Sequence, residues 1–158
     1  TTVRVVCNNT LSYATNKGES VSFTHLSEFD PSKMRDKLMC AVQTFGSFME
    51  MSKHLSKQRI MQSEAKDFVK RLLFTNTQLE SVNFDVESNR AYSKIISLFN
   101  GNAKGSELVG DSKWGMLNAV TEYFDHHHPA RDDSSRLNNS WFGHGNKIKA
   151  KAIELLTN

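Results

Sequence analysis

Cysteine and proline are scarce in this sequence, which has two of each among its 158 residues. Cys7 and Cys40 form no Cys-x-x-Cys pair and are too few for a disulfide framework, which indicates a reducing compartment and two small buried thiols. No apolar run approaches the roughly 20 residues that a membrane helix needs, and no signal peptide is visible. We therefore expect a soluble cytoplasmic protein with no membrane partner.

Several catalytic motifs are also lacking. The sequence has no Gly-x-Ser-x-Gly elbow, and a thiol nucleophile would need a histidine that only the fold could bring beside it. The glycines of residues 101–111 lack the Gly-Lys-Ser/Thr element of a phosphate loop. These absences argue against a serine hydrolase of that kind and against a P-loop protein, and no cofactor is predicted.

An excess of one charge is lacking as well. There are 20 Lys and Arg residues against 17 Asp and Glu residues, a net charge of +3, which is too small to indicate nucleic-acid binding by bulk electrostatics. Any basic surface must therefore be local. The composition is 38% hydrophobic and includes ten Phe residues, which excludes a wholly disordered chain. A single folded domain spanning residues 1–158 is expected.

The N-terminal part has the pattern of two short strands. Residues 1–6 contain a β-branched run, and residues 20–25 alternate polar and apolar side chains with Val21 and Phe23 on one face. A two-stranded ribbon is marginal by itself, and the sequence does not begin with Met. We expect that these strands form a small β-ribbon or sheet edge that pairs with a further N-terminal region or with another chain.

The remainder of the sequence predicts about five helices, so the expected fold class is α+β and mainly α. Their approximate ranges are 31–55, 64–74, 86–99, 112–127 and 146–156, from apolar residues at spacings of three and four. Asp30-Pro31 is a helix start, Asp111 or Ser112 is expected to cap the fourth helix, and Asn100-Gly101 is a left-handed stop. The polar residues 130–140 are expected to form a loop.

The segment from residue 110 to residue 129 carries the densest group of chemically active side chains. A helix would align Asn118, Glu122 and His126 on one face, and such a row can bind a metal ion or organise a proton transfer. Three further side chains could complete a coordination shell: Asp125, His128 and His144. No second ligand motif accompanies the row, so the alternative is that Asn118 and Glu122 bridge loops and that the histidines end a helix favourably. No metal is predicted, and Glu122 and His126 are the alternative ligands.

Basic side chains are clustered locally on three of the expected helices. The clusters are Lys53, Lys57 and Arg59; Lys66, Lys70 and Arg71; and Lys147, Lys149 and Lys151. The last cluster follows Trp141, Phe142 and His144, and cations beside flat rings can hold phosphates and stack bases. Ordinary solvated helix faces explain each cluster separately. Convergence on one surface would favour nucleic-acid binding.

Three blocks of sequence carry a resemblance to a known family. RVVCNNTL, GSELVGDSKWGMLNAVTEYFDHH and SWFGHGNKIKAKAIELL together resemble the C-terminal half of the phage/plasmid-like proteins grouped as domain-of-unknown-function family 932. The resemblance implies a bacterial host cell and an additional N-terminal region. It implies no catalytic residue, because the family has no settled activity. The positions that match the family pattern are Cys7, Asn8, Asn9, Trp114, Asn118, Glu122, Tyr123, His126, Trp141, Phe142 and Gly143.

These observations lead to three hypotheses of function. The first is a non-enzymatic accessory protein of a phage or plasmid that binds single-stranded or duplex nucleic acid in replication, recombination or defence evasion. The second is a metal-dependent hydrolase or nuclease that uses Glu122 and His126. The third is a structural module that associates with a second copy or with its own N-terminal region. The candidate functional cluster consists of Asn8, Asn9, Trp114, Asn118, Glu122 and His126, and the candidate nucleic-acid contacts are Trp141, Phe142, His144, Lys147, Lys149 and Lys151.

Overall fold

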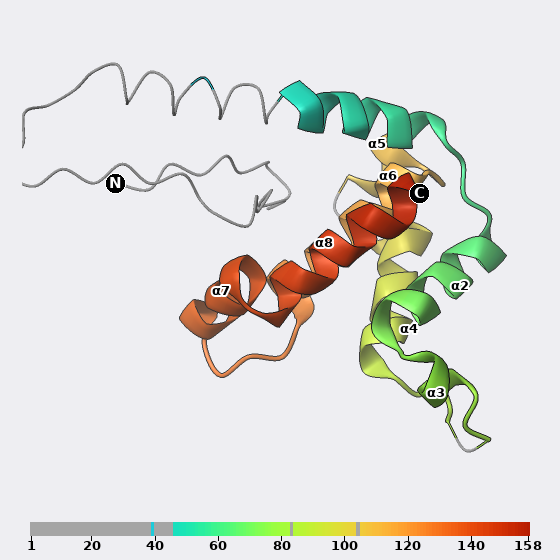
Figure 1. The fold of residues 1–158 in the computed structure, drawn as a ribbon. Helices are drawn as coiled ribbons and strands as arrows, with labels where there is room; N and C mark the ends of the chain where they lie inside the picture. The colour runs from blue at the N-terminus through green and yellow to red at the C-terminus, as the bar shows by residue number, and fades with distance from the viewer. Residues whose placement is uncertain (1–38, 40–45, 83, 104) are drawn as a thin grey trace, which may run out of the picture.

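The computed structural model describes residues 39, 46–82, 84–103 and 105–158, and these residues are mainly helical (Figure 1). Residues 46–57 form the first extended helical stretch. The α-helices that follow are α2 (Gln62–Leu73), α3 (Asn76–Leu79), α4 (Arg90–Ser97), α5 (Ser106–Val109), α6 (Lys113–Glu122), α7 (Asp133–Phe142) and α8 (His144–Thr157). Two π-helices continue α4 and α6 directly, namely η1 (Leu98–Asn102) and η2 (Tyr123–His127).

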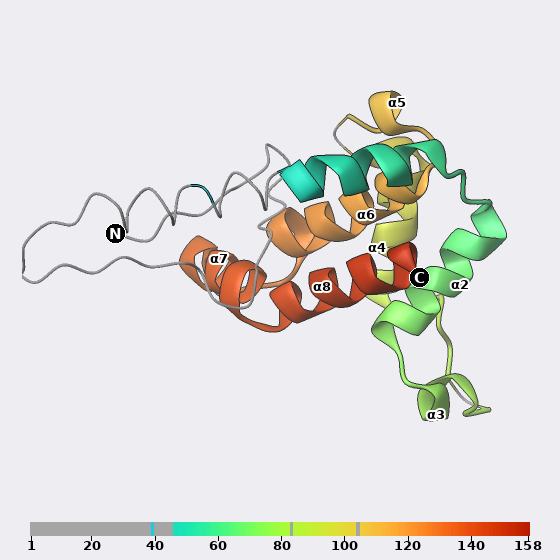
Figure 2. The ribbon, with the colours of Figure 1, turned by 45° about the horizontal axis from the view of Figure 1, so that its top comes forward.

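Helix α6 is the centre of the packing. Seven consecutive residues, Gly115–Thr121, are buried, and a helix that is buried all round lies in a core rather than on a surface. The helical residues 46–57 cover one side of α6, where Phe48 meets Trp114 edge to face at 5.7 Å between ring centroids. Helix α8 covers another side (Figure 2). Residues 110–129, which carry the densest group of chemically active side chains, therefore also contain the central helix of the described residues.

The apolar core joins α6 to the other helices through large side chains without exposed surface. Leu55, Ile95, Leu117 and Val120 are fully buried, and each buried aliphatic side chain of this size contributes roughly 1.5 to 3 kcal/mol to folding. Helix α2 packs against both α4 and α8 around this core. Helix α7 packs on α8 and on η2. Helix α8 also contacts α2 and α6, so it connects α7 to the rest of the core.

Several expectations about the helices are confirmed. Helix α2 begins two residues before the expected start, and α8 spans the expected last helix. Ser112 caps α6, because its Oγ accepts the N–H of Gly115 at 3.0 Å. Gly101 has a φ of 105°, the left-handed conformation expected at the end of the third helix.

Other expectations differ from the structure. The third helix begins at Arg90 rather than at residue 86, because the Asn89 side chain accepts the N–H groups of Ala91 and Tyr92 and so starts the helix there. The prediction of a loop at residues 130–140 was wrong. Asp132 accepts the N–H of Ser135 at 2.7 Å and caps α7, a strong helix start in a segment with few apolar residues.

The expected β-ribbon at residues 1–6 and 20–25 lies outside the described residues, as does the beginning of the first expected helix. The described part of the chain contains no strand and one isolated antiparallel bridge, between Arg59 and Ser112. It also exceeds the expected five helices, since α3 and α5 are single turns within connections and α7 replaces a loop. None of the helices formed by these residues is long and apolar enough to cross a membrane.

Candidate functional site

The row of polar residues on α6 ends in a π-turn. The N–H of His128 donates to the carbonyl of Tyr123, five residues earlier, at 2.7 Å. A π-turn contains one residue more than an α-turn and is frequent at functional sites. The extra residue therefore brings side chains five positions apart together here, in addition to side chains four apart.

This extra residue changes which histidine meets Glu122. The Oε1 atom of Glu122 lies 3.7 Å from Nε2 of His127, five positions later, whereas His126 is exposed. His128 stacks on the ring of Phe124, with centroids 5.5 Å apart and an interplanar angle of 24°. The three consecutive histidines thus have three different environments, and the turn separates His126 from the expected row.

The earlier members of the row are held within the helix and the core. Asn118 is buried, and its Nδ2 donates to the carbonyl of Trp114 at 2.8 Å. Thr121 donates to the carbonyl of Asn118 at 2.9 Å. The described members of the candidate functional cluster therefore run from a half-buried Trp114 to a solvent-exposed His126. Its two other members, Asn8 and Asn9, lie outside the described residues.

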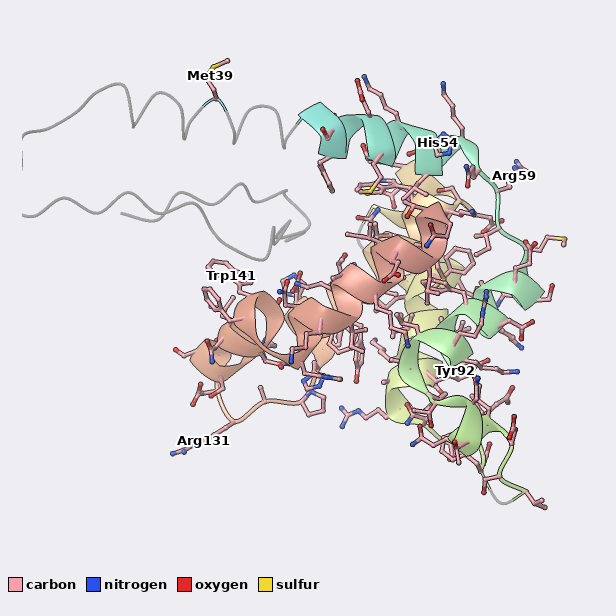
Figure 3. All side chains as sticks on the ribbon, in the orientation of Figure 1. Met39, His54, Arg59, Tyr92, Arg131 and Trp141 are labelled. Carbon is pink, nitrogen blue, oxygen red and sulfur yellow. The ribbon has the colours of Figure 1, made fainter. Side chains whose placement is uncertain are left out.

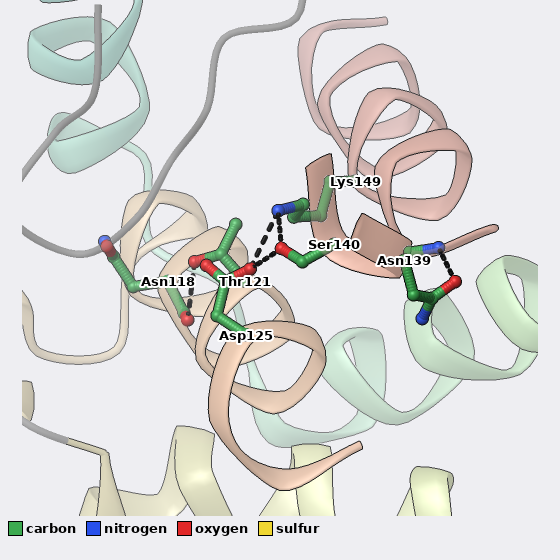
Figure 4. A network of polar contacts seen from close by, with 7 residues as sticks. Asn118, Thr121, Asp125, Asn139, Ser140 and Lys149 are labelled. Carbon is green, nitrogen blue, oxygen red and sulfur yellow. Dashed lines mark hydrogen bonds and ion pairs between the residues drawn. The ribbon is translucent and has the colours of Figure 1, made fainter. Parts of the chain in front are cut away.

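A buried polar cluster lies beside this row and joins three elements (Figure 4). Lys149 of α8 donates from Nζ to Oδ1 of Asp125 in η2 at 2.9 Å and to Oγ of Ser140 in α7 at 2.8 Å. Ser140 donates to the same Oδ1 atom. The side chains of Lys149 and Asp125 are only 4% and 3% exposed. Neither charge is solvated by water, so their mutual attraction must offset the cost of desolvation.

The hydrogen bonds of this cluster connect three helical elements. Lys149 donates to both Asp125 and Ser140, and Ser140 donates to Asp125. The Oδ2 atom of Asp125 is buried and has no hydrogen-bond partner among the described residues. The cluster therefore fixes η2, α7 and α8 in one arrangement, through interactions that are strong only while all three members are present.

The corner between α7 and α8 carries the expected aromatic contacts. Phe142 is 65% exposed, and its ring centroid lies 6.5 Å from that of the half-buried Trp141. His144 and Lys147 are exposed on the first turn of α8. Gly143 permits the close approach of the two helices, since a Cβ atom there would lie 2.9 Å from Cα of Asn139. We call Trp141, Phe142, His144 and Lys147 the aromatic corner; Figure 3 shows Trp141 at the end of the molecule away from Tyr92.

The structure does not bring the other two proposed nucleic-acid contacts to this corner. Lys149 is buried in the cluster with Asp125. Lys151 donates from Nζ to the carbonyls of Arg71 and Leu72, at 2.8 and 3.0 Å, where it satisfies the last carbonyl groups of α2. Both lysines connect α8 to its neighbours.

A metal site is not assembled from the residues in view. The ranges 46–82, 84–103 and 105–158, with residue 39, contain no group of three or more His, Cys, Asp or Glu side chains that could hold an ion. Glu122 faces His127 instead of His126. In this part of the chain, Glu122 and His126 therefore belong to no group of three possible metal ligands.

The pairing of Asp125 with Lys149 was missed from the sequence, although a signal was present. The buried positions of α8 are Gly145, Lys149, Ala152 and Leu156, at spacings of four, three and four. This is the period of a core-facing stripe, and Lys149 lies in the middle of it. A lysine within such a stripe indicates a buried acidic partner.

Comparison with known families agrees with the resemblance noted from the sequence blocks. The chain belongs to the family described as Domain of unknown function (DUF932), whose model matches residues 1–141. The matched residues make up most of the chain. They include Asp125 and Ser140 and end before Lys149. No curated protein and no solved structure matches the chain.

Proposed function

We propose that this protein is a non-enzymatic nucleic-acid-binding accessory protein and that the aromatic corner contacts the bases and phosphates. The observation that carries the proposal is Phe142, a large flat apolar side chain that is 65% exposed. An exposed ring beside cations is the arrangement on which unpaired bases stack, with about 1 to 3 kcal/mol per stacked base.

The polar groups of the corner support the same function. Lys147 is exposed one turn into α8, and His144 is exposed at its first residue. The amino-terminal end of a helix carries a partial positive charge and attracts phosphate groups. A phosphate beside the first turn of α8 would therefore lie close to a ring on which the neighbouring base can stack.

The geometry favours single-stranded nucleic acid over duplex. Stacking on Phe142 requires a base that is not already stacked between its neighbours in a duplex. The biological setting that we propose is replication, recombination or defence evasion of a phage or plasmid. That setting follows from the resemblance of the sequence blocks to phage/plasmid-like proteins.

Fluorescence anisotropy with labelled oligonucleotides tests the proposal. We expect a single strand to bind more tightly than a duplex of the same length, and the affinity to fall with rising salt as counterions are released. Phe142→Ala should weaken binding by at least about fivefold, which corresponds to the lower limit of stacking energy. Leu108→Ala is a matched control, because Leu108 is an 85% exposed apolar residue on α5.

A second variant separates phosphate contacts from stacking. Lys147→Gln should weaken binding and make the dependence of affinity on salt shallower, by about one unit of the logarithmic slope. Phe142→Ala should leave that slope unchanged. Absence of salt-dependent binding in the unsubstituted protein would contradict the proposal.

A further inference from the structure

A second surface with the chemistry of a binding site lies between α4 and η2, away from the aromatic corner. It is an open pocket with a volume of about 550 Å³. Arg90 and Lys94 line it from α4, and Tyr123 and His127 line it from η2. The remaining lining residues are serines of α4 and of the turn that precedes it: Ser88, Ser93 and Ser97.

The charge of this pocket is positive. Arg90 and Lys94 are four positions apart on α4, so they project from the same face of the helix. None of the seven lining residues is acidic. Neither Arg90 nor Lys94 forms an ion pair with another described residue. Two acids adjoin the pocket without lining it: Glu122, which faces the His127 ring at 3.7 Å, and Glu87, whose carbonyl accepts from Ser93.

The pocket also holds neutral hydrogen-bond donors. The Oγ atom of Ser97 accepts from Nδ2 of Asn102 at 3.0 Å, which leaves the proton of Ser97 for a ligand. Burial raises the pKa of the Tyr123 hydroxyl, and the nearby charge of Arg90 opposes that shift. The hydroxyl of Tyr123 is therefore protonated at neutral pH and able to donate.

We propose that this pocket binds a phosphate group, either free or carried by a small phosphorylated molecule such as a nucleotide. The guanidinium of Arg90 presents paired donors that match two phosphate oxygens, and Lys94 adds a mobile point charge. A volume of about 550 Å³ is within the range of small-molecule sites. The proposal does not depend on the aromatic corner, because the two surfaces share no residue.

A charge-matched pair of variants tests the site. Arg90→Gln/Lys94→Gln removes both pocket cations, whereas Lys53→Gln/Lys57→Gln removes two exposed cations from the helical residues 46–57. Inorganic phosphate and adenosine monophosphate are titrated into the 158-residue chain at constant ionic strength, with binding followed by amide chemical shifts. A single-stranded oligonucleotide without a terminal phosphate is the third probe.

We expect inorganic phosphate or adenosine monophosphate to shift the amide signals of α4 and η2. The pocket variant Arg90→Gln/Lys94→Gln should weaken that binding by about tenfold or more, because it loses charge-assisted hydrogen bonds. The control variant should bind as the parent does. If only the oligonucleotide depends on the pocket cations, the pocket holds a phosphate of a strand, and the small-molecule source is rejected. If neither anion shifts these amides and no probe distinguishes the two variants, the proposal is overturned.

Two further measurements keep the test decisive. A thermal melt of each variant shows whether it is folded, and Lys94→Gln alone, four positions into the helix, repeats the titration if the double variant melts early. Phe142→Ala provides the comparison with the aromatic corner. Phosphate binding that survives Phe142→Ala but not Arg90→Gln/Lys94→Gln assigns the pocket independently of nucleic-acid binding at that corner.

Discussion

Lys149 of α8 lies 2.9 Å from Asp125 of η2, and both side chains are buried. Ser140, the third member of this cluster, immediately precedes Trp141. The ion pair thus fixes the position of the α7–α8 connection, which carries the aromatic corner. A pre-positioned ring loses less entropy on binding than a mobile one, so the buried cluster supports the proposed function without contacting a ligand.

Loss of Lys149 should destabilise the fold strongly. Lys149→Met leaves Asp125 buried without its cation, and removal of one partner of a buried pair costs about 3 to 5 kcal/mol. Lys147→Met is the matched control, because Lys147 is exposed on the same helix and should change the free energy of unfolding by less than about 0.5 kcal/mol. Urea unfolding of the two variants measures the difference.

The double variant Asp125→Asn/Lys149→Met should recover part of the lost stability. It removes both charges, whereas the single variant leaves one of them uncompensated. A double variant that is destabilised by the sum of the two single effects would show that the two residues act independently. That result would contradict the structural role given to the pair.

Two glycines in helices should respond oppositely to alanine. A Cβ atom at Gly115 would lie 2.5 Å from the carbonyl oxygen of Gly110, whereas one at Gly46 would meet nothing within 4 Å among the surrounding atoms. Gly115→Ala should therefore destabilise the protein by about 1 kcal/mol or more, as overpacking exceeds the gain in helix propensity. Gly46→Ala should stabilise it by up to about 1 kcal/mol. Equal melting temperatures for the two variants would contradict the close approach at Gly115.

The sequence predicts the helices whose apolar residues recur regularly and misses those defined by their ends. Helices α2, α6 and α8 were found because their apolar stripes extend over several turns. Helix α7 has one buried residue, Ser140, so its period gives no signal, and only Asp132 with its capping hydrogen bond marks the start. Single-turn helices such as α3 are defined by local hydrogen bonds such as that from Gln78 N–H to Thr75.

The role of the candidate cluster stays a prediction, and the structure shows only how its described members are arranged. The sequence pointed to the residues of α6 and η2, yet regular helical spacing placed Glu122 next to His126. The π-turn adds one residue and brings Glu122 to His127, and no residue pattern in the sequence marks that insertion. The pocket cations Arg90 and Lys94 were not predicted, because η2 completes their pocket only in three dimensions.

The stability that Asp132 gives to α7 should be lost at acidic pH. The hydrogen bond from the Ser135 N–H holds the pKa of Asp132 below its ordinary value of 3.8. A lowered pKa in the folded state stabilises the protein above pH 3.8, and this contribution is lost as the pH falls from 3.8 through the folded-state pKa. Asp132→Asn retains a capping side chain that does not titrate.

Unfolding midpoints of the parent and of Asp132→Asn at several pH values measure this contribution. The advantage of the parent over the variant should be full at pH 7 and should shrink below pH 3.8. A difference between the two proteins that stays constant from pH 7 to pH 3 would show that the Asp132 carboxylate is not responsible.

Fluorescence of Trp141 tests nucleic-acid binding at the aromatic corner most directly. The protein has two tryptophans, and Trp114→Phe leaves Trp141 as the only one while it keeps an aromatic ring beside Phe48. Titration with an unlabelled single-stranded oligonucleotide should quench Trp141, and Phe142→Ala in the same background should weaken the midpoint by at least about fivefold. An unchanged Trp141 signal at oligonucleotide concentrations that saturate the protein in anisotropy would contradict binding at this corner.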